Sequence, residues 1–142
     1  MTQKDKDLLL KDICARLPYS VKASFYDVEK ECETYDVIEG VEIDKLTPSV
    51  YIRQYSLDIN EIKPYLFPLS SVSKEQIHQL LRNLKLGSYI LNKDFDITLL
   101  SSRSFNLVNF ESVFKFFDKN YIDYRGLIPK GLAIDATNKN IY

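Results

Sequence analysis

The sequence predicts an α+β domain, in which a small antiparallel sheet of three or more strands over residues ~20–58 packs with about three helices at ~2–17, ~73–86 and ~109–118. Two patterns predict this class. Apolar and polar residues alternate in the segment assigned to the sheet, as expected for strands with one face in water. Apolar residues recur every three or four positions in the three helical segments. At 142 residues the chain has the length of one domain, so we expect residues 1–142 to form a single unit.

The first helix is predicted from its cap and its apolar stripe. Thr2 suits the N-cap, and Leu9, Ile13 and Leu17 recur at four-residue steps. Leu10 and Cys14 fill the same stripe, so we expect Cys14 to be buried as a small hydrophobe, and we expect both cysteines of the chain to be reduced. Pro18 ends the helix because its ring disfavours helical backbone before it.

Three strands are predicted next, each from β-branched or aromatic residues that alternate with polar ones. A turn at Thr47–Pro48 separates the second and third strands. The polar segment 27–34 joins the first two as either an exposed hairpin tip or a longer loop. The alternating residues are Val21, Ala23 and Phe25, then Val41 and Ile43, then Val50 and Ile52.

The second half of the chain begins with an extended connector at residues 63–69, where two prolines exclude helix interior. Ser73 and Gln76 form the capping box of the second helix, and Gly87 suits its end. Short strands are expected at 89–91 and 97–100, and the third helix has a phenylalanine-rich face. Residues 127–134 can add one more strand and a terminal hook.

The charge distribution limits the classes of partner. The formal net charge is −1, but residues 23–61 carry three basic and ten acidic residues, whereas residues 62–142 carry eleven basic and seven acidic ones. The N-terminus lacks the apolar core of a signal peptide, and no stretch approaches the ~18 apolar residues of a membrane span. We therefore expect a soluble, cytoplasmic protein.

Four acidic residues at alternate positions, Asp27, Glu29, Glu31 and Glu33, are candidates for an acidic surface. They would share a face on a strand, where hard cations bind oxygen clusters. The spacing does not fit an EF-hand, because Cys32 and Ile38 stand where that loop needs glycine and glutamate. A solvated acidic hairpin is the favoured interpretation, and no metal or cofactor is predicted.

Catalytic patterns are few. His78 is the single histidine, on the second predicted helix, and neither a Gly-x-Ser-x-Gly elbow nor a glycine-rich phosphate loop is present. An enzyme that uses a carboxylate pair alone stays open, because acidic residues are plentiful. The sequence favours a non-enzymatic protein and predicts no catalytic residue.

Three stretches, at residues 8–19, 63–71 and 123–134, resemble an uncharacterised family of small proteins from phages, prophages and mobile elements of gut Bacteroidales-type bacteria. The resemblance covers about a quarter of the chain. It implies a mobile-element setting in a bacterial host and no particular activity.

The same three stretches contain the candidate partner-binding residues, which are Tyr65, Tyr124, Arg125 and Lys130. Tyrosine and arginine dominate the energetics of protein interfaces. The favoured interpretation of the stretches themselves is that they pack together and hold the fold, with Asp12 and Asp123 as candidate ion-pair partners of Arg16 and Arg125.

We therefore expect an accessory protein that acts by protein–protein binding. The alternatives are a nucleic-acid-binding protein that uses the mildly basic C-terminal half, and an acidic mimic of a phosphate backbone.

Overall fold

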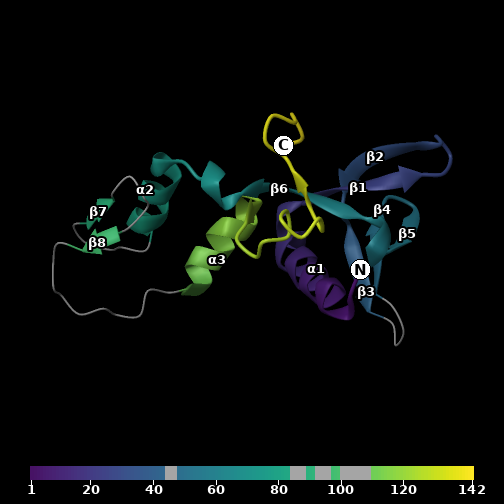
Figure 1. Cartoon of the computed structure of the whole chain (residues 1–142), viewed down its shortest axis with the longest axis horizontal. Helices are drawn as coiled ribbons and strands as arrows, with labels where there is room; N and C mark the ends of the chain where they lie inside the picture. The colour runs from purple at the N-terminus through teal and green to yellow at the C-terminus, as the bar shows by residue number, and fades with distance from the viewer. Residues whose placement is uncertain (44–47, 84–88, 92–96, 100–109) are drawn as a thin grey trace. The chain divides into compact units, whose positions relative to one another are not determined.

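The structure is a computed structural model that describes residues 1–43, 48–83, 89–91, 97–99 and 110–142 (Figure 1). It has three helices and several small sheets, so the predicted α+β class is confirmed. The chain divides into two compact units, of which one comprises Met1–Ser71 with Phe117–Tyr142 and the other Val72–Phe116. Each unit is described by itself below.

The first unit begins with helix α1 (Gln3–Arg16), which Thr2 caps in a reciprocal capping box with Asp5. Leu9 and Ile13 are fully buried, as the apolar stripe predicts. Cys14, in contrast, is exposed, so the prediction that it is buried is wrong. It lies one position beyond Ile13, and at 100° per residue this step turns its side chain off the buried stripe.

A five-stranded sheet forms the centre of this unit, in the order β10–β6–β1–β2, with β9 also paired to β6. The strands β1 and β2 form an antiparallel hairpin, and β6 is antiparallel to β1, whereas β9 and β10 are parallel to β6. The strands are β1 (Lys22–Asp27), β2 (Cys32–Val37), β6 (Lys63–Pro68), β9 (Ile122–Asp123) and β10 (Ile134–Asp135).

A separate three-stranded antiparallel meander consists of β3 (Gly40–Ile43), β4 (Pro48–Ile52) and β5 (Tyr55–Asp58). The predicted strands at 41–43 and 50–52 are therefore present, but they belong to this second sheet. The predicted Thr47–Pro48 turn lies partly outside the described residues, because the structure describes β4 from Pro48 onward.

The predicted connector at 63–69 is extended, as expected, but it is the central strand β6 with a short 3-10 turn after it. The register of the β1–β6 pairing explains why this strand tolerates Pro64. Ser24 and Lys63 are paired, and Ala23 faces Pro64. Ala23 directs its own N–H and C=O toward β2 on the other side, so Pro64 stands where β1 requires no donor.

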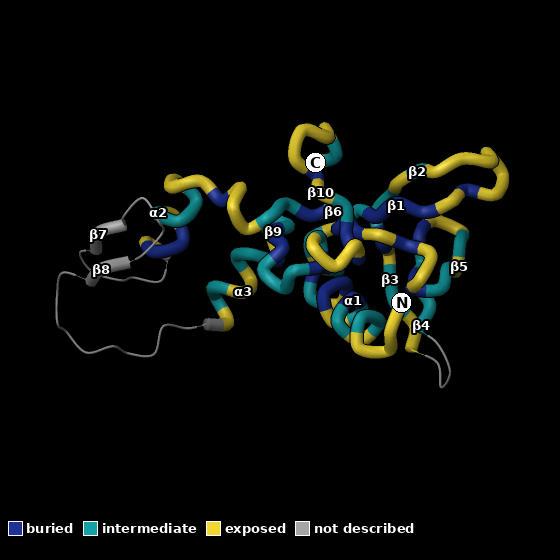
Figure 2. Tube along the Cα trace, viewed as in Figure 1, coloured by how far each residue is buried: buried dark blue, intermediate teal, exposed yellow. Residues whose placement is uncertain are grey.

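One hydrophobic core joins these elements. Leu9 and Ile13 of α1 pack with Ala23, Phe25 and Leu66 on one face of the five-stranded sheet. The meander contributes Val50 and Ile52 to the same cluster. Figure 2 shows most of β1 as buried, and Tyr26 is the exposed residue of this strand. The opposite face of the sheet, which we term the outer face, does not contribute to this cluster.

The second unit contains α2 (Lys74–Asn83), the antiparallel pair β7 (Tyr89–Leu91) and β8 (Ile97–Leu99), and most of α3 (Phe110–Lys119). The capping box of α2 is confirmed, since Gln76 N–H donates to Ser73 Oγ at 3.2 Å and Ser73 N–H donates to Gln76 Oε1 at 2.8 Å. The predicted extension of this helix to 86, its stop at Gly87 and the first residue of the third helix, 109, lie outside the described residues.

Candidate binding surfaces

A buried ion network joins α1 to residues near the end of α3 and to the segment after it. Arg16 is fully buried, and all five of its N–H donors have acceptors. Its Nε and Nη2 bind the two oxygens of Asp12 at 2.7 and 2.9 Å. The remaining donors reach main-chain oxygens of Phe117, Asp118 and Ile122 at 3.3, 3.4 and 2.8 Å. Such a fork cannot be replaced by lysine.

Arg125 completes the network. Its Nη1 lies 2.7 Å from Asp12 Oδ1 and 3.0 Å from Asp118 Oδ1, and its side chain is 14% exposed. Its guanidinium stacks over the Tyr124 ring at 4.2 Å. Burial would lower the pKa of Arg125, but the two carboxylates outweigh burial and raise it. Burial is also the main reason why the pKa of Tyr124 rises to about 12. The charges of two arginines and two aspartates balance, and their contacts link α1 to residues 117–125.

Asp123 has a different role from the predicted one. Its carboxylate accepts the backbone N–H groups of Leu127 and Ile128, both at 2.8 Å, and so fixes the turn after β9. Asp118, which the sequence analysis did not single out, is the second carboxylate of the network. No local pattern signals Asp118, because its partners lie on α1 and beyond the end of its own helix.

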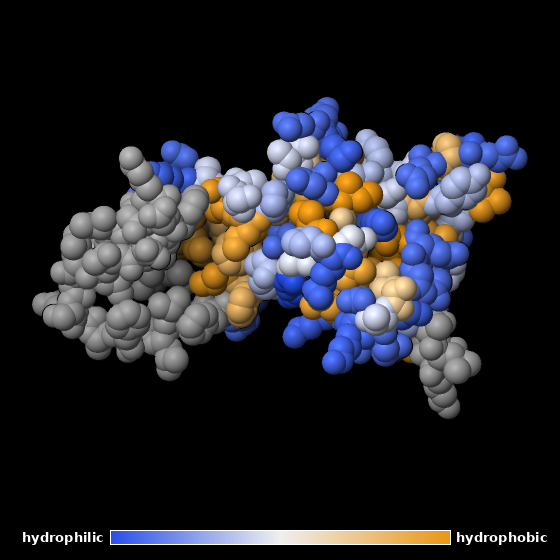
Figure 3. Space-filling view, viewed as in Figure 1, coloured by the Kyte–Doolittle hydropathy of each residue, from blue (hydrophilic) through white to orange (hydrophobic). Residues whose placement is uncertain are grey.

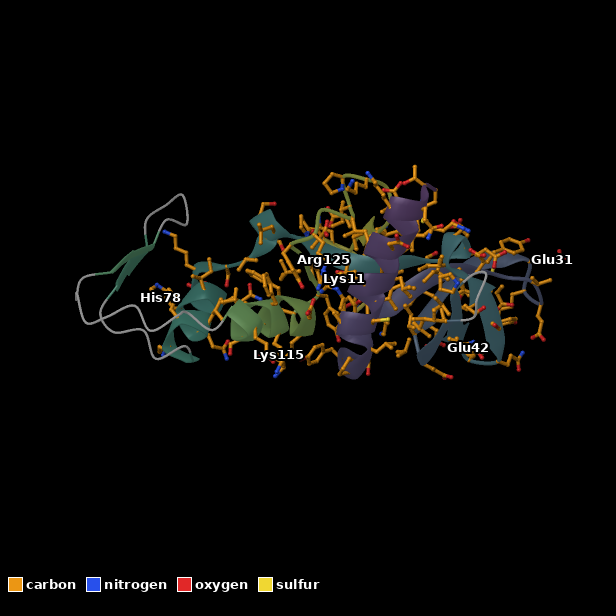
Figure 4. All side chains as sticks on the ribbon, turned by 90° about the horizontal axis from the view of Figure 1, so that it is seen from below. Lys11, Glu31, Glu42, His78, Lys115 and Arg125 are labelled. Atoms are coloured by element: carbon orange, nitrogen blue, oxygen red, sulfur yellow. The ribbon has the colours of Figure 1, made fainter. Side chains whose placement is uncertain are left out.

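The four candidate partner-binding residues fall in three settings. Tyr124 and Arg125 lie at the ion network, where Figure 4 shows Arg125 beside α1. Lys130 is exposed on the segment before β10. Tyr65 is on β6, in contact with Tyr35 and Tyr142. The structure thus gives Tyr65 surroundings different from those of the other three.

A row of tyrosines lies on the outer face of the five-stranded sheet. Register places Tyr26 opposite Glu33 and Tyr35 opposite Ser24 on this face, with Tyr65 beside them on β6. The Tyr35 and Tyr65 rings meet edge to face at 5.8 Å. Lys22 Nζ lies 5.9 Å from the Tyr35 ring centre and 5.8 Å from that of Tyr142. We term Lys22, Tyr26, Tyr35, Tyr65 and Tyr142 the tyrosine face.

Tyr142 attaches the end of the chain to this face. Its hydroxyl accepts the Lys22 N–H at 3.2 Å and donates to the Tyr65 carbonyl at 2.8 Å, so it bridges β1 and β6. Its ring stacks on that of Tyr121 with 3.8 Å between centroids. Much of the face nevertheless stays open, because Tyr26, Tyr35 and Tyr142 are 53%, 43% and 41% exposed.

The acidic candidates lie at the end of the β1–β2 hairpin, so the hairpin-tip alternative of the sequence analysis is confirmed for residues 28–31. Glu29, Glu31 and Glu33 are exposed, and Figure 4 shows Glu31 at the far end of the hairpin. Figure 3 shows hydrophobic side chains among hydrophilic ones there, and Val28 is 71% exposed.

Asp27 does not belong to an exposed acidic surface with the other three carboxylates, as we predicted, because it is only 1% exposed. Its carboxylate accepts the N–H groups of Glu29 and Lys30 and the Tyr55 hydroxyl, the last at 3.0 Å, and pairs with Lys30 Nζ at 3.2 Å. Burial would raise the pKa of Asp27, but the bonds from Tyr55 and Lys30 outweigh burial and lower it. Asp27 thus shapes the turn that displays the three glutamates.

Two features are absent from the described part of the chain, a metal-binding cluster and a membrane-spanning helix. No three histidine, cysteine or acidic side chains gather there in a way that could hold a metal ion. No helix among these residues is long and apolar enough to cross a lipid bilayer.

Comparison with known proteins gave no match to a family model, to a curated protein or to a solved structure.

Proposed function

We propose that this chain is a non-enzymatic accessory protein that binds another protein through its tyrosine face. One observation carries the proposal: Tyr26 and Tyr35 expose about half of their side chains on the outer face of the five-stranded sheet, beside Tyr65 and Tyr142. Tyrosine contributes a large contact area with few rotatable bonds and is enriched at interface hot spots. The ion network offers no comparable surface, because its arginines and aspartates already bind one another.

The setting that we propose is a phage or mobile element in the cytoplasm of a bacterial host. The similarity of residues 8–19, 63–71 and 123–134 to such proteins supports it. Two of these segments contribute three of the four charged residues of the ion network, with Asp12 and Arg16 from the first and Arg125 from the third. The second segment contributes β6 and with it Tyr65.

Single-stranded nucleic acid is the second candidate partner, because tyrosines beside Lys22 and Lys63 resemble the aromatic platforms on which bases stack. Two features disfavour it. Arg125, a cation of the mildly basic C-terminal half, is bound by Asp12 and Asp118. The exposed glutamates 29, 31 and 33 lie near the tyrosine face and would repel a phosphate backbone.

The test uses the tagged full chain as bait in lysate of a Bacteroidales host, with and without nuclease. The double variant Tyr26→Ser and Tyr35→Ser removes the exposed rings, and the double variant Ile43→Ser and Leu69→Ser removes two exposed apolar side chains elsewhere. We expect one protein partner to be retained by the wild type and the control variant, and at least about tenfold less by the tyrosine variant. Equal retention by all three, or loss on nuclease treatment, would contradict the proposal.

A further inference from the structure

Strand β2 has an open edge. It is the last strand in the order β10–β6–β1–β2, and no described strand pairs with its other side. Ile38 N–H donates to the Val21 carbonyl at 2.9 Å, and this bond identifies which residue pairs of the β1–β2 ladder are hydrogen-bonded. Bonded pairs alternate along an antiparallel ladder. Residues 32, 34 and 36 therefore bond to β1, and Glu33 and Tyr35 direct their N–H and C=O groups outward.

The open edge adjoins the tyrosine face. Glu33 and Tyr35 place their side chains on the outer face of the sheet, together with Tyr26. A strand added along β2 would set alternate side chains about 4.5–5.5 Å from Glu33 and Tyr35. It would form backbone hydrogen bonds with the edge, which supply affinity in strand addition. Its side chains would contact the tyrosines, which supply specificity.

The charges beside this edge favour a basic segment as the one that binds there. Lys30 pairs with Asp27 and Arg53 with Asp36, so these cations are already bound. Glu31 and Glu33 are exposed and have no ion pair within the described residues. Lysine or arginine in an incoming strand can pair with these glutamates and lie over the Tyr26 and Tyr35 rings, as Lys22 already lies over Tyr35 at 5.9 Å.

The same charges disfavour a second copy of this chain as the occupant. A second copy would bring the exposed Glu31 and Glu33 to this edge, and its own β2 holds no lysine or arginine that could pair with them. Like charges directly opposite each other destabilise a strand pair.

Building on the proposed function, we infer that the partner protein adds an extended segment rich in lysine or arginine to the open edge of β2. The hairpin needs no rearrangement to accept it, because its turn is already fixed by the hydrogen bonds to Asp27.

The inference is tested by NMR titration of the ¹⁵N-labelled full chain with a synthetic nine-residue peptide of alternating lysine and threonine. We expect the largest shift changes at the amides of Glu33 and Tyr35, at peptide concentrations up to ~1 mM. A second peptide of the same sequence carries N-methyl groups on alternate amides, so it keeps its charge but cannot pair with the edge. We expect it to bind at least about tenfold more weakly.

Matched variants separate edge binding from general charge attraction. Glu31→Gln with Glu33→Gln should weaken binding of the lysine peptide several-fold. Asp7→Asn with Glu75→Gln removes two exposed acids elsewhere and should leave binding unchanged.

Four results would overturn the inference: no shift change at 1 mM peptide, equal binding of the N-methylated peptide, tighter binding of oligothymidylate, or concentration-dependent shifts of Glu33 and Tyr35 without peptide. If one of these occurs while the Tyr26→Ser and Tyr35→Ser bait still loses its protein partner, the proposed function stands and only the mode of binding is wrong.

Discussion

The ion network and the tyrosine face each place a cation over a tyrosine ring, Arg125 over Tyr124 in one and Lys22 over Tyr35 in the other, but they differ in exposure. In the network, Arg16 and Asp12 are fully buried, and the Arg16 donors are all occupied. On the tyrosine face, rings and a lysine lie in contact, but several stay about half exposed. This difference in exposure and spare bonding capacity is the reason why we propose the tyrosine face, and not the ion network, as the binding surface.

The largest expected effect lies at the centre of the network. Replacing Arg16 by Met leaves Asp12 buried without its principal partner and leaves the oxygens of Phe117 and Ile122 without their donor. We expect the free energy of unfolding to fall by about 3–5 kcal/mol, measured by urea denaturation. The control is Arg53→Met, whose ion pair with Asp36 is half exposed and should cost at most about 1 kcal/mol. An equal fall in the free energy of unfolding in the two variants would show that the buried network stabilises the fold no more than an exposed ion pair does.

Arg125 offers the next test, because it lies in the network and was also predicted to bind a partner. Arg125→Gln removes a cation shared by Asp12 and Asp118, and it should lower the free energy of unfolding by about 2–3 kcal/mol. The folded variant should retain the protein partner as well as the wild type does. Loss of partner with unchanged stability would instead place Arg125 in the interface.

A smaller effect is expected at the bridge between β1 and β6. Tyr142→Phe keeps the stacked ring but removes the hydroxyl that joins Lys22 N–H to the Tyr65 carbonyl. We expect a loss of about 1 kcal/mol in the free energy of unfolding. Hydrogen exchange should quicken at the Lys22 amide and stay unchanged in α1, whereas uniform acceleration would contradict a local bridge.

The smallest effect is expected for Asp27, and the lowered pKa of Asp27 defines the sign of its pH dependence. Its pKa is lower in the folded chain than in the unfolded one. The ionised carboxylate therefore stabilises the fold at neutral pH, and this contribution is lost as the pH falls through the folded-state pKa. Between pH ~5 and ~2, the free energy of unfolding should fall less steeply in Asp27→Asn than in the wild type. A parallel pH dependence in the two proteins would refute this role for Asp27.

The sequence predicted those elements whose signals are local. The cap at Thr2, the capping box at Ser73 and the strand predicted from residues 21–25 each depend on a few neighbouring residues, and the structure confirms them. The polar Ser24 is nevertheless buried, so the alternation in sequence is not matched by an alternation in burial. Strand β6 was taken for a connector because its prolines are acceptable only in the register that sets Pro64 against Ala23. Register depends on distant pairing, which the local pattern does not contain.

The candidate site shows the same limit. The pairing of Arg125 with Asp12 links residues 113 positions apart, and Tyr65 joins Tyr35 and Tyr142 across three strands and the end of the chain. Residue type alone suggested that Tyr65 and Arg125 share a role. Only the register of the sheet assigns Tyr65 to the open face and Arg125 to the network.

Hydrogen exchange of the full chain with and without its captured partner distinguishes β2 from the network segment as the interface. We expect slower exchange on binding at Glu33 and Tyr35, and no change at residues 118–128, where the network lies. Slower exchange at residues 118–128 with none at β2 would contradict this expectation and would make the network segment the interface.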